Sequence, residues 1–441
     1  MHTYDIFFLF AFLPVYMGIY ALTPPKRRSW VMTAGNIVFA VSGGLFCMTM
    51  YIVCTICAYF SGIAVYNMRT DRSKERLRRA VVVGNCILAA AVLLAGSPRG
   101  IDIGALAPFK AAMLAVMPLH MISYITDVYR GECEAQTSLA QLAAYIGFFP
   151  SAGYGPVLRY NTVRSGFAEP KTDVSRLSEG IRYYILGLAA YVVIARRLSE
   201  LHRELLGTPV SQLRGGTAVM GIFVYYAWFG TAVIGSVFMG HGLSEMQGIN
   251  SGHSFRRRFM QPRTDRRLCE FNMPLCRWLR DYVTMPLRRA GVKKAYAFSV
   301  AVILGALWYD LSVGWLTGAL LLCLRGAAQS ALNKNRKRGE QHYIIGSLYA
   351  KLATLLAVAC GAVWELGHGR ATVELLRSGS VGDDLFYTFF SEALLPTLIG
   401  LLIAGSMLHS LIKRMNLRWF KLVLPVAELM FLAIATAYMV R

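Results

Sequence analysis

Long apolar runs, separated by short polar or basic stretches, account for most of this chain. A helix rises about 1.5 Å per residue, so about 20 apolar residues cross a hydrocarbon core about 30 Å thick. We therefore predict an all-α integral membrane protein with about eleven transmembrane helices plus re-entrant segments, in a single polytopic membrane domain over residues 1–441. The runs that approach this length, some of them short, lie near residues 5–22, 30–44, 46–67, 80–97, 103–126, 181–196, 217–240, 343–366, 388–411 and 418–440.

Two interruptions of this pattern mark segments that do not cross the membrane as one helix. Residues 295–329 have basic clusters on both flanks, so the chain returns to the side it left, with about 20–25 Å of helix in each half. We predict two short limbs that meet near Tyr309 and Asp310, where an aspartate at membrane depth favours a pocket. Residues 148–156 (FFPSAGYGP) contain prolines and glycines that stop a continuous helix. We expect the two breaks to enclose one pocket.

The charge pattern predicts an orientation in the membrane. The formal net charge is +22, and Lys and Arg concentrate near residues 26–28, 69–79, 256–294 and 334–338. Such clusters stay in the cytoplasm, so we place the N-terminus outside and expect the first apolar run to remain as the first span. No aromatic-interleaved soluble module accompanies the basic residues, so we expect contact with membrane lipid and no nucleic-acid partner.

Cysteine and histidine form no motif for metal or redox chemistry. The nine cysteines are scattered, and the CxxC pair of Cys54 and Cys57 lies inside an apolar run with no histidine nearby. A packing role is therefore the prediction for these cysteines, and we expect no metal and no bound cofactor.

The most informative stretch is residues 271–282 (FNMPLCRWLRDY), a charged and aromatic run in an otherwise apolar chain. With residues 307–309 (LWY), 127–132 (DVYRGE) and 148–156, it resembles the membrane-bound O-acyltransferase (MBOAT) family. The branch that it resembles contains the alginate O-acetyltransferase membrane subunit and the D-alanyl transferase of teichoic acids. In this chain, the MBOAT-like core is expected to cover about residues 103–330. This sequence departs from that branch at Asn272 and Tyr309, where the branch usually has histidine.

The resemblance implies a function in the bacterial cytoplasmic (inner) membrane. The family passes an acyl group from a cytosolic thioester, acetyl-CoA or an acyl carrier protein, to a hydroxyl on the far side. We therefore expect O-acylation, most simply O-acetylation, of a secreted or cell-surface polysaccharide, with a periplasmic SGNH-like acetyltransferase or another membrane or secretion subunit as a partner. The alternative is a catalytically inactive relative that serves as a scaffold, acyl conduit or regulator. The acceptor, the acyl group and the donor stay open.

The chemistry of the reaction selects the candidate site residues. The attacking hydroxyl must lose a proton, and histidine is the natural base. A phenol such as that of Tyr309 is protonated at neutral pH, and the Asp310 carboxylate is a weak base unless burial raises its pKa. Asn272 either orients a carbonyl or hydroxyl or caps a helix. The donor-binding and pocket candidates are Arg277, Trp278, Arg280, Asp281, Tyr282, Trp308, Pro150, Gly155 and Pro156.

Spacing and position add two further expectations. Arg277 and Asp281 are four residues apart, so on a helix they share a face and can pair. A relocated catalytic base is considered at His120, His241 and His253, whereas the remaining histidines are expected to be solvated. Those five are His2, His202, His342, His368 and His409.

Overall fold

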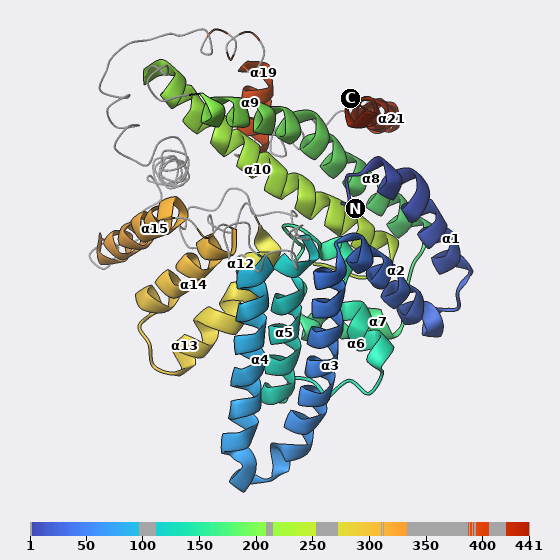
Figure 1. The fold of residues 1–441 in the computed structure, drawn as a ribbon, viewed down its shortest axis with the longest axis vertical. Coiled ribbons are helices and arrows are strands. Elements are labelled where there is room, and N and C mark those ends of the chain that lie inside the picture. Colours follow the sequence, from blue (N-terminus) through green and yellow to red (C-terminus); the bar gives the residue numbers. More distant parts are fainter. Residues whose placement is uncertain are drawn as a thin grey trace. The chain divides into compact units, whose positions relative to one another are not determined.

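The computed structural model describes helices throughout most of the chain and no strand among the described residues (Figure 1). It describes residues 2–96, 112–208, 215–252, 272–309, 311, 313–332, 387, 389, 391, 394–404 and 420–440. The all-helical class expected from the apolar pattern is therefore confirmed for this part of the chain. The predicted span near residues 343–366 lies outside it, as do the basic clusters at 256–271 and 334–338.

The chain divides into two compact units, which are described separately. The first unit contains Met1–Ile185, Ser236–Ser254 and Val440, and the second contains Leu186–Gly235, Phe255–Met439 and Arg441. Two helices, α8 (Val174–Ala189) and α10 (Gly215–Met246), contribute residues to both units. The single membrane domain with a core near residues 103–330 stays a prediction.

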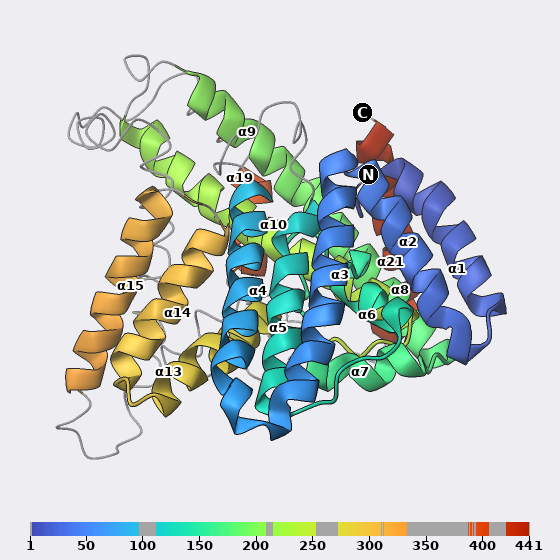
Figure 2. The same cartoon turned by 60° about the horizontal axis from the view of Figure 1, so that its bottom comes forward.

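The first unit is built on antiparallel helices near the N-terminus. The helices α3, α4 and α5 lie side by side in both views (Figures 1 and 2), and α6 packs against α2. A π-helical turn at Phe8–Phe12 leads into α1, so the first apolar run is helical to Leu22. The elements are α1 (Leu13–Leu22), α2 (Arg28–Ser42), α3 (Leu45–Asn67), α4 (Glu75–Gly96), α5 (Met117–Arg130), α6 (Leu139–Ile146), α7 (Tyr160–Ala168), the first part of α8 and the last part of α10.

Glycine and proline set the helix ends of this unit. Pro24 and Pro25 follow α1 and cannot continue a helix. Gly44 has φ +97° in the turn between α2 and α3, and Gly131 has φ +74° at the C-terminal end of α5. A left-handed residue at these positions satisfies terminal carbonyl groups, as Gly131 does by donating to Val128 O at 3.1 Å.

Four helical stretches among the described residues are long and apolar enough to cross a membrane: Leu45–Thr70, Arg72–Gly96, Val174–Leu205 and Gly215–Met246. They coincide with the runs near residues 46–67, 80–97, 181–196 and 217–240. The third continues beyond its predicted end because α8, a π-helical turn at Ala190–Ala195 and α9 (Arg196–Gly207) follow one another without a break. The run near residues 103–126 is described from residue 112, where a 3₁₀ turn at Ala112–Ala115 precedes α5.

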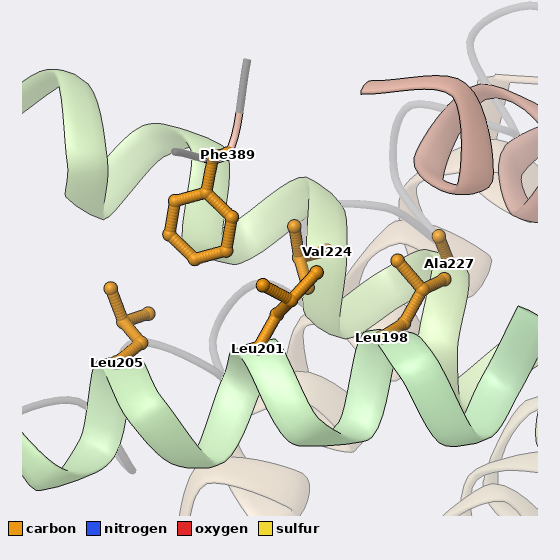
Figure 3. Packing of buried hydrophobic residues seen from close by; sticks show 6 residues of the cluster. All are labelled: Leu198, Leu201, Leu205, Val224, Ala227 and Phe389. Atoms are coloured by element: carbon orange, nitrogen blue, oxygen red, sulfur yellow. The ribbon is translucent and has the colours of Figure 1, made fainter. Parts of the chain in front are cut away.

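The second unit carries the charged and aromatic motif. A small apolar cluster joins α9 to α10 and to Phe389, and its side chains interdigitate in Figure 3. Its residues are Leu198, Leu201, Leu205, Val224, Ala227 and Phe389.

Apart from α9 and the first part of α10, the elements are α12 (Met273–Leu279), a π-helical turn (Arg280–Thr284), α13 (Met285–Arg289), α14 (Lys294–Tyr309), α15 (Val313–Leu332), α19 (Leu394–Ala404) and most of α21 (Phe420–Val440).

Candidate functional site

The predicted break at residues 148–156 is confirmed as a buried, largely non-helical segment of the first unit. After α6 ends at Ile146, one 3₁₀ turn at Phe149–Ser151 leads into irregular backbone that continues to Arg159. Gly153 has φ +83° and Gly155 has φ +108°, conformations that favour glycine. Most of these residues are buried, with Gly153, Tyr154 and Arg159 partly exposed, so the buried backbone polar groups need partners from the protein.

One face of α5 holds the end of the segment and the start of α7. Three side chains accept hydrogen bonds there: His120 Nε2 from Leu158 N of the segment at 3.1 Å, and, from the first turn of α7, Ser123 Oγ from Tyr160 N at 2.9 Å and Asp127 Oδ2 from Asn161 N at 3.0 Å. Spacings of three and four residues place these acceptors on one side of a helix. The buried Asp127 of the DVYRGE motif is thus accounted for by a backbone amide partner.

A single amide on α2 satisfies the other end of the segment. Asn36 is fully buried, and its Oδ1 accepts from Phe149 N at 3.0 Å. Its Nδ2 donates to Ala144 O at 3.0 Å and to Ala143 O at 3.3 Å, near the end of α6. Asn36 therefore joins the last turn of α6 to the first turn of the broken segment. The apolar sequence around Asn36 does not predict this role.

The histidines considered as relocated bases hold structural positions where they are described. Leu158 N can only donate, so Nε2 of His120 is unprotonated, and Nδ1 carries the proton toward Ile146 O at 3.3 Å. His241 Nδ1 lies 2.5 Å from Ser251 Oγ, and its ring meets that of Tyr183 edge to face. His253 lies outside the described residues.

The expectation that His202 is solvated is wrong. Its side chain is buried on α9, where its ring stacks on Trp228 at 5.4 Å and lies 4.9 Å from the ring of Tyr225. The predicted apolar run ends near residue 196, so His202 was placed outside it, although the chain stays helical to Gly207. The leucines of α9 are spaced by three and four residues and form its buried face. This spacing could have indicated that the helix continues past residue 196.

Helix α10 passes close to the broken segment through Gly240. A Cβ built on Gly240 would lie 2.6 Å from Gly155 O and 2.5 Å from Pro156 Cδ, and would also overlap Pro150 O. These are the three pocket candidates from the first unit, and α10 packs directly on their backbone. Their role in a pocket stays a prediction, whereas their close packing against a glycine is observed.

In the second unit, the charged motif forms a helix whose start is capped by Asn272. The Asn272 side chain is buried and its Oδ1 accepts from Leu275 N at 3.1 Å, so of the two roles expected for it the structure shows the cap. Trp278 is buried and its ring lies 5.1 Å from that of Tyr282. The motif thus presents an apolar face to the protein, as the helical spacing predicts.

The charged residues of the motif lie near the surface of their unit. Arg280 Nε donates to Asp281 Oδ1 at 2.7 Å, and the two side chains are 61% and 21% exposed. An ion pair this exposed contributes little stability. From Arg280 to Thr284 the helix is a π turn. The Arg277–Asp281 pair was predicted from the four-residue spacing of a regular α-helix, and the π turn changes the angle between the two side chains. That pair stays a prediction.

The two helices predicted within residues 295–329 are α14 and α15, which pack against each other and follow one another after Tyr309. Their return to the side of the membrane they left stays a prediction. The Tyr309 ring meets Phe229 edge to face at 5.2 Å and lies 5.6 Å from the ring of Trp315. Trp315 Nε1 donates to Tyr225 Oη at 3.2 Å. The end of α14 is therefore held in an aromatic cluster with α10, while Asp310 lies outside the described residues.

The motif helix and α14 form a helical hairpin. They are joined by a tight turn at Gly291 (φ +87°), and α14 packs against α12, the π turn and α13. A Cβ on Gly305 would lie 3.0 Å from Leu279 Cδ1, which shows how closely the two helices approach. In such an antiparallel hairpin, Asn272 lies at the same end as Trp308 and Tyr309.

The structure therefore brings together only part of the predicted site. Asn272, the 277–282 motif, Trp308 and Tyr309 share the second unit, whereas Pro150, Gly155 and Pro156 belong to the first. The pocket predicted between the two breaks stays a prediction. Among the described residues no group of three or more His, Cys, Asp or Glu side chains could hold a metal ion.

Comparison with known proteins places this site in a family context. The chain is 28% identical over 333 residues to the probable alginate O-acetylase AlgI of Pseudomonas syringae pv. tomato. The proteins of the same name from Pseudomonas fluorescens and Azotobacter vinelandii are also 28% identical, over 320 and 327 residues. The matches cover 70%, 70% and 68% of this chain. No family model matches the chain.

These comparisons confirm the resemblance to membrane-bound O-acyltransferases that the motifs indicate. Within that class, the particular resemblance is to the alginate O-acetylases. The chain spans about three fifths of the length of these relatives, 62% for the Pseudomonas syringae protein.

The contact between α10 and the broken segment yields a test with a matched control. Alanine in place of a helical glycine gains about 1 kcal/mol of helix propensity. We expect Gly240→Ala to lose more than that gain, with a net destabilisation of about 1–3 kcal/mol from overpacking against backbone atoms.

Gly18 on α1 is the control, because a Cβ there meets no atom within 4 Å. Thermal unfolding of the full chain in detergent should show a lower midpoint for Gly240→Ala and an unchanged or higher one for Gly18→Ala. Equal midpoints for the two variants would show that α10 does not pack on the segment.

Proposed function

We propose that this chain is the membrane component of a system that O-acetylates a secreted or cell-surface polysaccharide. The observation that carries the proposal is the resemblance over about 70% of the chain to proteins named alginate O-acetylases. The structural features agree with it, because the motif residues 272–282 and 308–309 lie on one helical hairpin. The acceptor is a polysaccharide hydroxyl.

The donor in this proposal is a cytosolic thioester, acetyl-CoA or an acyl carrier protein. Both carry phosphates, which arginine binds through charge-assisted hydrogen bonds. The exposure of Arg280 supports a role in donor binding at the surface, with Asp281 orienting its guanidinium. From Arg280, Arg277 and Trp278 lie toward the hairpin end that holds Tyr309, and Tyr282 lies in the following π turn, where its ring contacts Trp278.

The location in the proposal is the bacterial inner membrane. The four long apolar helices support a multi-pass protein. With the segments outside the described residues, we propose about eleven spans plus re-entrant segments, and an external N-terminus. A periplasmic SGNH-like acetyltransferase or another secretion subunit is the proposed partner, because the acetyl group must reach a polymer outside the cell.

The chemical step needs a base, and the described histidines considered for it have other roles. His120 and His241 make structural contacts in the first unit, and His253 lies outside the described residues. Of the remaining candidates we propose Asp310, next to Tyr309 in the sequence, as the base. The acceptor hydroxyl would attack the thioester carbonyl as its proton passes to the Asp310 carboxylate, and the thiolate would leave. Tyr309 positions that end of α14 through its aromatic contacts.

The alternative is an inactive relative that acts as a scaffold, acyl conduit or regulator for another transferase. The tyrosine at position 309 and the capping role of Asn272 favour it, because neither group is a base at neutral pH. The alternatives separate on one point, whether the purified chain by itself releases free thiol from the donor.

The proposed topology predicts a labelling pattern in intact cells. In a chain whose native cysteines have been replaced, Lys26→Cys and Arg76→Cys should react only with reagents that enter the cytosol. Ser42→Cys, at the end of α2, should react with an impermeant maleimide from outside. Labelling of position 26 or 76 from outside would invert the topology and remove the cytosolic donor route.

The proposed base predicts a specific kinetic pattern in proteoliposomes supplied with acetyl-CoA and alginate. Asp310→Asn should lower acetyl transfer by about 10²- to 10⁴-fold, the usual contribution of a general base. Tyr309→Phe, which keeps the ring packed on Phe229 and Trp315, should leave the rate nearly unchanged.

Asp71→Asn is the control, because Asp71 lies in the exposed turn between α3 and α4, outside the proposed site. Loss of activity in Tyr309→Phe with full activity in Asp310→Asn would transfer the role to the phenol. Absence of thiol release from every form of the chain alone, with release on adding a partner transferase, would favour the scaffold.

A further inference from the structure

A cavity of about 330 Å³ lies in the first unit, and no residue of either break in the apolar pattern lines it. Its walls come from the turn after α1 and from the segment between α7 and α8. The lining residues are Pro25, Arg28, Glu169, Pro170, Lys171 and Thr172. Neither the motifs nor the proposed acyl transfer uses these residues.

Arg28 connects the two walls of the cavity. Its Nη1 donates to Thr172 Oγ1 at 3.0 Å and to Pro170 O at 3.3 Å, while its Nε donates to Thr23 O at 3.1 Å. The guanidinium also lies over the ring of Tyr20, 4.9 Å from its centroid. Hydrogen bonds on both sides hold the cation in place, so the cavity has a preformed positive wall.

The second wall is also anchored and carries both signs of charge. Arg176 Nη1 donates to Lys171 O at 3.1 Å, which fixes the backbone beside the cavity. The Glu169 and Lys171 side chains are exposed at its mouth. The lining therefore offers two cations and one carboxylate, the pattern that complements a phosphate next to an ammonium.

The surroundings of the cavity suit a lipid. Lys26 and Arg27 are exposed in the adjoining turn and belong to a cluster predicted to face the cytosolic leaflet. Large apolar side chains near the lining residues in sequence are exposed: Leu22 is 89% exposed, Trp30 65% and Val174 84%. A tryptophan beside basic residues at the end of an apolar helix is typical of the membrane interface.

We infer that this cavity binds the phosphoethanolamine headgroup of a glycerophospholipid. The phosphate would contact Arg28 and Lys171, the ammonium would contact Glu169, and the acyl chains would run along the exposed apolar residues. The site is independent of the proposed acyl transfer, and it secures the turn after α1 to the segment before α8.

Native mass spectrometry of the detergent-purified full chain tests the inference. Phosphatidylethanolamine and phosphatidylglycerol with identical acyl chains are added in turn to the wild type and to variants. The wild type should retain phosphatidylethanolamine more strongly, and Lys171→Gln should lower this retention about tenfold through loss of a charged contact. Glu169→Gln should abolish the preference for phosphatidylethanolamine over phosphatidylglycerol.

Lys74→Gln is the matched control, because Lys74 is an exposed basic residue at another predicted cytosolic turn. Equal retention in Lys171→Gln and Lys74→Gln, or preference of the wild type for phosphatidylglycerol, would overturn the inference. Competitors separate a lipid from a free anion. Glycerophosphoethanolamine should displace the lipid and inorganic phosphate should not, whereas equal displacement by phosphate would identify a simple anion site.

Discussion

The structure of the first unit depends on satisfying backbone polar groups where the chain is not helical. Residues 148–159 are mostly buried, and apart from one 3₁₀ turn they lack the internal hydrogen bonds of a helix, which water does not replace in an apolar setting. An unsatisfied buried amide costs about 1–3 kcal/mol, so several of them would offset much of a protein's net stability. Side chains from α2, α5 and α10 supply the missing partners.

This constraint explains several polar residues inside apolar surroundings. Asn36 contacts backbone of this segment and of α6, whereas Ser123 and Asp127 accept hydrogen bonds from the first amides of α7, and Asp127 belongs to a motif that also marks the family resemblance. A buried carboxylate needs hydrogen-bond partners. The Asn161 amide is one such partner of Asp127, so part of the motif serves to hold the start of α7 against α5.

The second unit uses a different means to hold its candidate site. Tyr309 stands where the resemblance leads us to expect a histidine, and its ring packs with Phe229 and Trp315 between α10, α14 and α15. Asn272, at the other departure from the family, caps the motif helix. Both departures are thus accommodated by packing and capping, and the chemistry proposed for this end of the hairpin falls to Asp310.

Some of this architecture could be predicted from sequence because its causes are local. Apolar run length indicated the long helices, and proline with glycine indicated the break near Pro150. The flanking basic clusters required a return near Tyr309, where α14 gives way to α15. The hydrogen bonds of Asn36 and the contact of Gly240 with the broken segment join residues more than 80 positions apart. No local sequence pattern predicts such contacts. His202 was predicted to be solvated because it lies beyond the apolar run near 181–196, although the helix continues to Gly207.

Hydrogen–deuterium exchange of the full chain in detergent tests the central claim most directly. Peptides that cover residues 157–161 should exchange slowly, as in a helix, because the Leu158, Tyr160 and Asn161 amides donate to buried side chains on α5. Peptides from the exposed turn between α3 and α4 provide the fast reference. Exchange of residues 157–161 as fast as that turn, in a chain that is otherwise protected, would contradict the account.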